Sequence, residues 1–445
     1  MRKIGIYRIM LISAVVFFNS CKKDEAEFTK LETSEYSSDV VLDWIRLTLQ
    51  LTEETPGFTP PVAARVYGYT GLALYEGVRY GMPGYLSLEG QLSDFNQGMI
   101  PITNEDEEYH WAAVANATLA VLLKSCFQTA SASNLSLMNE LELRFENEFR
   151  MEASTDIMER SIQFGKSVGT AVLSYANTDG QAECYNSNFP SSYTVSVGEG
   201  LWEATSPSEP IPLQPYWGEV RPFMQVNVGE LPESPPPYST DTNSDFYLEA
   251  IEVYEAVQNL TPEQKIIAEF WSDDPGNTAT PPGHSYSIMM QILSDEESDL
   301  ARTAEVYAKL GMGIHDAFVS CWKAKYHYNL VRPITYIHQH IDDTWVIPLA
   351  TPPFPEYTSG HSVQSGATAK ILTDLFGEDY SFTDNTHIGR NDIDGSPRFF
   401  DSFYAFADEA AISRLYGGIH YRAGIEVGVD QGIRVGQNIG TLEFK

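Results

Sequence analysis

Pro352-Pro-Phe-Pro-Glu-Tyr-Thr-Ser-Gly-His-Ser362 is the stretch around which the rest of this chain is organised. Its prolines cannot donate backbone hydrogen bonds, so the first half of the stretch is expected to be extended. Apolar residues then recur at helical spacing over 363–375, which places Ser359, Gly360 and His361 at the start of a helix. A helix start offers free N–H groups and the positive end of the helix dipole, and both favour an anion. Alone, the stretch is better explained by an ordinary serine N-cap.

A second segment, upstream, adds two basic residues. Apolar residues between Tyr307 and Trp322 repeat three or four positions apart, and Lys325 continues the same helical face. An unpaired buried ammonium is costly, so Lys325 is expected either to extend to water, the more common outcome, or to meet an anion. Arg332 follows seven residues later, directly before Pro333.

A third segment lies downstream. Gly417 and Gly418 are expected to end one helix near Tyr416, and His420 would then open the next. Arg414 and His420 would therefore face one cavity from two sides of a bend. Taken singly, each is better explained as a surface arginine or as a satisfied core histidine.

Together the three segments read K-x6-R-P, S-G-H and S-R-x5-H, in that order. This pattern resembles the three-part signature shared by vanadium-dependent haloperoxidases and the phosphatidic-acid-phosphatase type 2 superfamily of class A acid phosphatases. Trp322 and the proline-rich lead-in with Phe354 look like the haloperoxidase branch, as does the block from Ile267 to Asp274. The likeness covers roughly residues 38 to 440, is specific after about residue 260, and is closest to bacterial iodoperoxidases.

The resemblance implies an all-α fold of two helical bundles with long irregular loops, and one vanadate per subunit. It makes His420 the metal ligand, with Asp274 bracing Arg414. The residues expected to hold the oxyanion are Lys325, Arg332, Ser359, Gly360, Arg414 and Asp274. The formal net charge of the chain is −33, so basic residues grouped at one site call for an explanation. A tetrahedral oxyanion supplies one, because arginine and lysine bind its oxygens.

The resemblance also implies catalytic roles. His361 is expected to act as acid and base while hydrogen peroxide is loaded, and Lys325 to polarise the peroxide. Phe354 and Trp322 are expected to line an apolar approach for the halide. Two departures from the family pattern stand out: Thr358 replaces the usual proline, and Lys323 replaces a frequent acid, which bears on halide or pH preference.

Three functions remain open at this point. The first is oxidation of halide, iodide foremost, by hydrogen peroxide to hypohalous acid. The second is an exported acid phosphatase in which His420 attacks phosphorus and His361 protonates the leaving alcohol. The third is a non-catalytic surface lipoprotein, which leaves the ordered residue set unexplained. The halide range, the organic acceptor and the oligomeric state are not fixed by the sequence.

The N-terminus predicts export. Residues 1–20 combine basic residues with a short apolar run and read as a signal peptide. Cys21 is expected to be lipidated and 21–37 to form a tether, which makes the protein a periplasmic, outer-membrane or cell-surface lipoprotein, either attached or released. The lipid would be its membrane contact, since the apolar run is too short to span a bilayer. The strong negative charge excludes nucleic acid as a partner.

The remaining chain divides by composition. A helical bundle is expected over 38–177, an irregular crossover over 178–243, and a second bundle with the oxyanion site over 244–445. Cys126 and Cys184 allow one disulfide that spacing cannot establish. The segment 384–401 hints at a calcium loop, but Arg390 occupies the first ligand position, so a solvated loop is the better interpretation.

Overall fold

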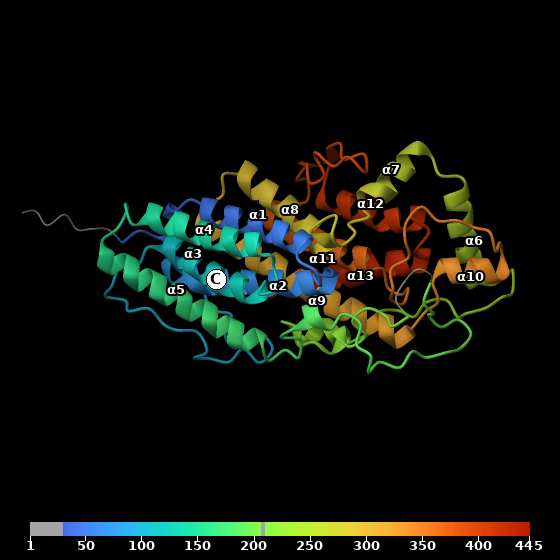
Figure 1. Ribbon diagram of the computed structural model, residues 1–445, viewed down its shortest axis with the longest axis horizontal. Coiled ribbons are helices and arrows are strands. Elements are labelled where there is room, and N and C mark those ends of the chain that lie inside the picture. Colours follow the sequence, from blue (N-terminus) through green and yellow to red (C-terminus); the bar gives the residue numbers. More distant parts are fainter. Residues whose placement is uncertain (1–29, 206–209) are drawn as a thin grey trace, which may run out of the picture. The chain divides into compact units, whose positions relative to one another are not determined.

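The helix α9 (Leu300–Tyr328) is the element on which both halves of the chain pack. The computed structural model describes residues 30–205 and 210–445, so the predicted signal peptide, Cys21 and most of the tether lie outside the described residues. Helices from both halves contact α9: α2 (Pro60–Val78) from the first half, and α11 (Gly360–Phe376) and α13 (Arg422–Ile439) from the second (Figure 1). The Asp299 side chain caps the start of α9 by accepting the Arg302 N–H.

The other elements fill in around this centre. The first half contains η1 (Thr33–Glu35), α1 (Asp39–Glu54), η2 (Arg79–Gly81), α3 (Trp111–Cys126), α4 (Ala132–Phe149) and α5 (Thr155–Ala176). An irregular segment follows with η3 (Cys184–Asn186), η4 (Trp217–Glu219) and η5 (Gln225–Val228). The second half adds α6 (Asp245–Gln258), α7 (Pro262–Phe270), α8 (Thr280–Asp295), α10 (Pro333–His340), β1 (Phe382–Asp384), β2 (Arg398–Phe400) and α12 (Phe403–Tyr416).

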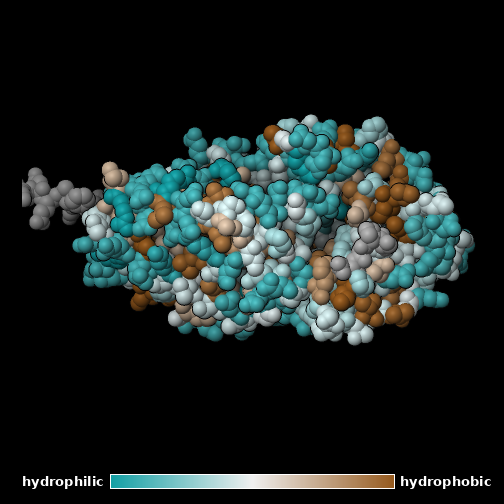
Figure 2. Space-filling view, viewed as in Figure 1, coloured by the Kyte–Doolittle hydropathy of each residue, from teal (hydrophilic) through white to brown (hydrophobic). Residues whose placement is uncertain are grey.

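The all-α prediction is confirmed, apart from the short antiparallel pair β1–β2. Residues 31–445 form one compact unit, and the predicted boundaries within it stay predictions. Cys126 and Cys184 are free thiols, so the disulfide that spacing allowed is not formed. Across the described residues no helix has the length and apolar character that crossing a bilayer requires. The face in Figure 2 is mostly hydrophilic, with apolar residues in separate groups.

Glycines let α11 and α13 approach closely. A Cβ at Gly432 would lie 2.0 Å from the Val363 carbonyl oxygen, and one at Gly428 would lie 2.8 Å from the Cβ of Ser362. The contacts advance along both helices in the same direction, from Gly428 beside the start of α11 to Gly436 beside Lys370. The two helices therefore run parallel, and both N-termini lie at the same end.

A buried charged network lies below that end. The ring of His284, on α8, is 2.9 Å from Asp273 Oδ2 through Nδ1 and 2.7 Å from Asp384 Oδ2 through Nε2. His387 donates from Nε2 to the carbonyl of Phe270 at 2.9 Å. Because these nitrogens have protein partners, we interpret the cluster of Asp273, His284 and His387 as an ion-pair network rather than as a metal site.

The network corrects one expectation. The sequence predicts a solvated loop for the segment that holds Asp384 and His387, but both residues are buried, at 0% and 2% exposure. The exposed part of that segment holds Asp392, which pairs with Arg390. The Trp271 ring stacks on His284 with ring centres 4.4 Å apart, so the network also fixes Trp271.

The pH dependence of stability tests this network. Burial lowers the pKa of His284, but Asp273 and Asp384 outweigh it and raise the pKa to about 10. A histidine whose pKa is raised by folding stabilises fully below its unfolded pKa of about 6.5 and loses that contribution as pH rises through about 10. We expect His284→Gln to remove a part of the decline in unfolding free energy from pH 7 to 10, at most about 1.4 kcal/mol per pH unit.

Urea unfolding at several pH values measures this effect. His327→Gln, an exposed histidine of α9, is the control and should keep the wild-type slope. Identical slopes for the wild type and His284→Gln would contradict the assignment of a charged His284.

Candidate oxyanion site

Three helices begin at one place in the second half of the chain. Arg332 is the N-cap of α10, Ser359 is the N-cap of α11, and Tyr421, directly after His420, is the N-cap of α13. The Ser359 N–H donates to the Gly424 carbonyl at 2.9 Å, which joins the starts of α11 and α13. Helix N-termini carry partial positive charge, so this arrangement favours an anion before any side chain is counted.

Arg332 ties the surrounding segments together. Its side chain is 0% exposed and donates from Nε to the Phe354 carbonyl at 2.9 Å and from Nη1 to the Ile419 carbonyl at 2.8 Å. Nη1 is also 3.2 Å from His420 Nε2, whereas Nη2 has no hydrogen-bond partner among the described residues. A buried guanidinium with an unused donor is poised for a further acceptor.

Arg414 is buried in the same way on α12. Its Nη1 donates to the Trp271 carbonyl at 2.6 Å, and its Nε has no partner in the described part of the chain. Within the described chain no hydrogen bond or ion pair joins Arg414 to Asp274, although both line the same cavity. The bracing role of Asp274 therefore stays a prediction, and the contact observed here is with the backbone of Trp271.

Lys325 does not extend to water. Its side chain is 0% exposed, and Nζ donates to the carbonyls of Pro355 at 3.1 Å, Glu356 at 2.9 Å and Thr358. Burial lowers the pKa of Lys325 to about 7. These hydrogen-bond partners are neutral carbonyls, so the lysine holds the proline-rich loop in place and would gain most from a neighbouring anion.

Both site histidines are held in the neutral form. Burial lowers the pKa of His420 well below its usual value, and the nearby Arg332 lowers it further. Burial and then Arg414 do the same to the pKa of His361. Although His361 Nε2 is buried, no described residue hydrogen-bonds to it. Neutral imidazoles carry a lone pair, so His420 is competent as a ligand and His361 as a base.

Ser359 and Gly360, at the start of α11, add two further hydrogen-bond donors to the site. The N-cap interpretation of Ser359 is correct, because its Oγ accepts the Ser362 N–H at 3.3 Å. Accepting that bond leaves the hydroxyl proton free to be donated to an anion. Gly360 is the first residue of α11, and the helix itself has no acceptor for its N–H.

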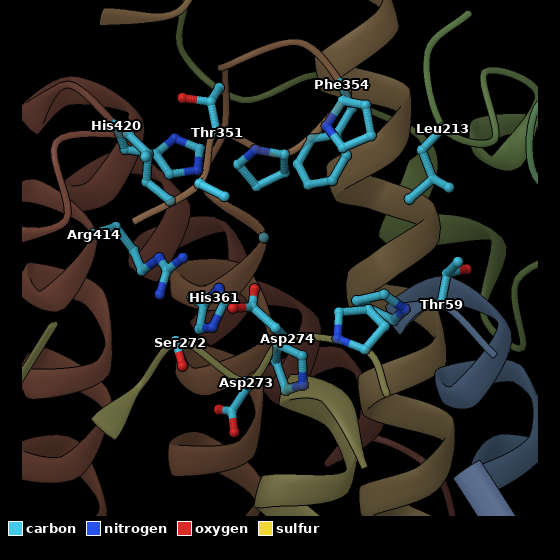
Figure 3. Close-up of a pocket in the computed structure, with 18 of the residues that line it drawn as sticks. Thr59, Leu213, Ser272, Asp273, Asp274, Thr351, Phe354, His361, Arg414 and His420 are labelled. Atoms are coloured by element: carbon cyan, nitrogen blue, oxygen red, sulfur yellow. The ribbon is translucent and has the colours of Figure 1, made fainter. Parts of the chain in front are cut away.

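A cavity of about 490 Å³ opens onto these groups. Figure 3 shows Arg414, His361 and His420 on one side, with Leu213 and Thr59 opposite. The wall is mostly apolar: Trp322 is 1% exposed, and its ring centre is 5.0 Å from that of Phe354. Of the two departures from the family pattern, Lys323 donates to the Val228 carbonyl, and Thr358 donates to Gln431 of α13 at 2.7 Å.

Two residues of this site are not indicated by the sequence. Glu356 lies inside the quoted stretch, yet nothing in its spacing indicates that its carboxylate reaches His420, 64 positions away, at 2.7 Å. Trp271 lies in the block that resembles the family, but no pattern there points to a role for its carbonyl. Acidic and aromatic residues close to signature positions are the signal that the sequence offers.

The residues present fit a tetrahedral oxyanion. Lys325 and Arg332 are buried near the carboxyl group of Glu356, and Arg414 is buried near those of Asp273 and Asp274. Among the described residues none of the three basic side chains forms an ion pair with a carboxylate, because their hydrogen bonds go mainly to backbone carbonyls. Arg332 and Arg414 also keep donor atoms that no described residue engages. Buried donors without acceptors are costly, and vanadate or phosphate would supply the missing acceptors together with negative charge. The neutral His420 adds a nitrogen ligand that vanadate can take.

Known proteins share this arrangement. The family model for the second helical-bundle domain of VCPO matches residues 305–347 and 339–443. Vanadium chloroperoxidase from Curvularia inaequalis is 22% identical over 499 aligned residues, which cover 88% of this chain and 80% of that protein.

Solved structures extend the comparison. A bacterial vanadium-dependent chloroperoxidase in its holo form has a TM-score of 0.66 at 14% identity over 87% of this chain and 92% of that one, which shows a common fold. The first bacterial vanadium-dependent iodoperoxidase has a TM-score of 0.82 at 34% identity over 92% of this chain and 97% of its own. The chain therefore belongs to the vanadium-dependent haloperoxidase family.

Proposed function

We propose that this enzyme oxidises halide with hydrogen peroxide to hypohalous acid, with iodide as its first substrate and one vanadate per subunit. The observation that carries the proposal is the set of buried cations with unused donors around His420. Iodide is proposed because the 34% identical relative is an iodoperoxidase and because iodide is the halide most easily oxidised.

Vanadate, when bound, supplies a Lewis acid that activates hydrogen peroxide without a change of oxidation state. His420 Nε2 is the nitrogen that would hold it. Lys325, Arg332 and Arg414 would neutralise its negative charge, and the Ser359 hydroxyl and the Gly360 N–H would donate to its oxygens. His361 Nε2, neutral and not engaged by any described residue, would accept the proton that peroxide gives up on entry.

The apolar wall has a separate task. Trp322 and Phe354 present ring surfaces to the cavity beside the cationic floor. A large polarisable halide loses less hydration energy at such a wall than a small ion does, and bulk water is kept from the oxidised product.

A phosphatase would use the same side chains with His420 as nucleophile. Two observations favour the peroxidase: the aromatic pair of Trp322 and Phe354 and the similarity to the iodoperoxidase over nearly the whole chain.

Loss of the nitrogen ligand tests the proposal. The wild type, incubated with vanadate, should take up one equivalent and form triiodide from iodide and hydrogen peroxide. His420→Ala should lose stoichiometric uptake, because no other described side chain places a nitrogen lone pair at Arg332 Nη1. Vanadium is measured by elemental analysis after desalting, and the control His327→Ala, an exposed position, should match the wild type. Hydrolysis of a chromogenic phosphate ester without iodide oxidation would support the phosphatase instead.

His361→Ala separates binding from turnover. Because His361 is assigned to proton transfer and not to the metal, the variant should retain vanadate but oxidise iodide about 10²- to 10⁴-fold more slowly. Steady-state rates and vanadate titrations on the same preparation measure both quantities. An unchanged turnover rate would remove His361 from the mechanism.

We also propose that the chain is exported and carries a lipid on Cys21, which is supported by the basic and apolar residues that precede this cysteine. Metabolic labelling in a bacterial host with a clickable fatty acid should label the wild type, and Cys21→Ala should abolish the label. Equal labelling of both proteins would refute the assignment.

A further inference from the structure

We propose that Glu356 is a positioning residue that fixes His420 as the tautomer with its proton on Nδ1, and thereby directs the Nε2 lone pair at the oxyanion. The inference rests on the proposed function, which makes His420 the vanadium ligand. It concerns a contact that joins the proline-rich loop before α11 to the start of α13.

The first step concerns the Nδ1 side of the ring. Glu356 Oε1 is 2.7 Å from His420 Nδ1 and 3.0 Å from the backbone nitrogen of Tyr421. The Tyr421 amide can only donate, so Oε1 acts as an acceptor. When Oε1 carries no proton of its own, the hydrogen in the contact with His420 belongs to Nδ1. This holds for the ionised carboxylate, and also for the acid with its proton on Oε2.

The second step concerns the Nε2 side. Arg332 Nη1 lies 3.2 Å from His420 Nε2, and a guanidinium can only donate. Nε2 must therefore carry the lone pair. A neutral imidazole with its lone pair on Nε2 has its proton on Nδ1, so the contact with Arg332 also fixes the direction of the hydrogen bond from Nδ1 to Glu356.

The third step is that the fold holds Glu356 for this contact. Its side chain is 0% exposed, its N–H donates to the Leu330 carbonyl at 3.1 Å, and its own carbonyl accepts from Lys325. Gly424 leaves the space for the carboxylate, because a Cβ there would lie 2.5 Å from Oε1. Oε2 has no hydrogen-bond partner within 30–205 and 210–445, so the side-chain bonds of this buried acid converge on His420 and the adjoining amide.

A carboxylate behind a ligating histidine sets both the orientation and the basicity of the ring. Removing such a partner typically weakens metal binding about 10- to 100-fold. Here the carboxyl oxygen of Glu356 would orient His420 towards vanadate. When vanadate binds, Arg332 would exchange its hydrogen bond with His420 Nε2 for one to the oxyanion.

Two substitutions test the assignment on the full chain. Glu356→Gln keeps an acceptor oxygen of the same reach, whereas Glu356→Leu fills the space without one. Histidine-selective ¹⁵N spectra of the vanadate-free protein report which ring nitrogen is protonated, and the His420 signals are assigned by their absence in His420→Ala. We expect the Nδ1–H pattern in the wild type and in Glu356→Gln, and its loss in Glu356→Leu.

Vanadate affinity gives the second readout. By isothermal titration, Glu356→Gln should bind within a few-fold of the wild type, and Glu356→Leu about 10- to 100-fold more weakly. Glu76→Leu is the matched control, since Glu76 is also 0% exposed and accepts a backbone N–H, from Leu88 at 2.7 Å, but lies on α2. It should lower the thermal midpoint without changing vanadate affinity.

The two levels of inference fail separately. A wild type that binds no vanadate would end the proposed function, while the ¹⁵N spectra would still test the contact. An unchanged tautomer and affinity in Glu356→Leu would overturn the role of Glu356 while leaving the function intact. Loss of the Nδ1–H pattern in Glu356→Gln to the same degree as in Glu356→Leu would also overturn it.

Discussion

The structure depends on buried basic side chains that form no direct ion pair with a carboxylate among the described residues. Lys325, Arg332 and Arg414 are all removed from water, and their observed partners are mainly backbone carbonyls. Carbonyl dipoles replace part of the lost hydration but supply no net negative charge. The site therefore has buried donor groups whose acceptors a bound oxyanion would supply.

A small number of contacts between segments that are distant in the sequence hold these basic side chains in place. The C-terminal turns of α9 bring Lys325 to the proline-rich loop, and the glycine contact between α11 and α13 brings two helix starts to one end. Below them, the charged network around His284 holds the Trp271 ring, and the Trp271 carbonyl holds Arg414. Each cation is thus fixed by backbone groups whose own positions are set by helix packing. Such support is what keeps a catalytic constellation in its productive geometry.

The sequence predicts the site better than it predicts the support beneath it. The resemblance to a family signature points to Arg332, Ser359 and His420, and the structure brings their three segments together. The partners of His284 lie 11 and 100 positions away, and no local pattern indicates pairing over such distances. The helix α10 is not predicted, because eight residues after a proline carry too little periodicity. Lysines on apolar helix faces usually extend their ammonium group to water, but the packing of the surrounding segments buries Lys325 completely.

The two sides of the cavity come from different parts of the chain. Every group assigned to gripping the oxyanion by direct contact lies after residue 320, whereas Thr59, Phe189 and Leu213, also in the lining, lie before residue 220. Substitutions in the earlier segments can reshape that part of the lining while the residues assigned to the oxyanion stay unchanged. The shape of the cavity and the chemistry of its cationic side can therefore change independently in evolution, because they are encoded in different parts of the chain.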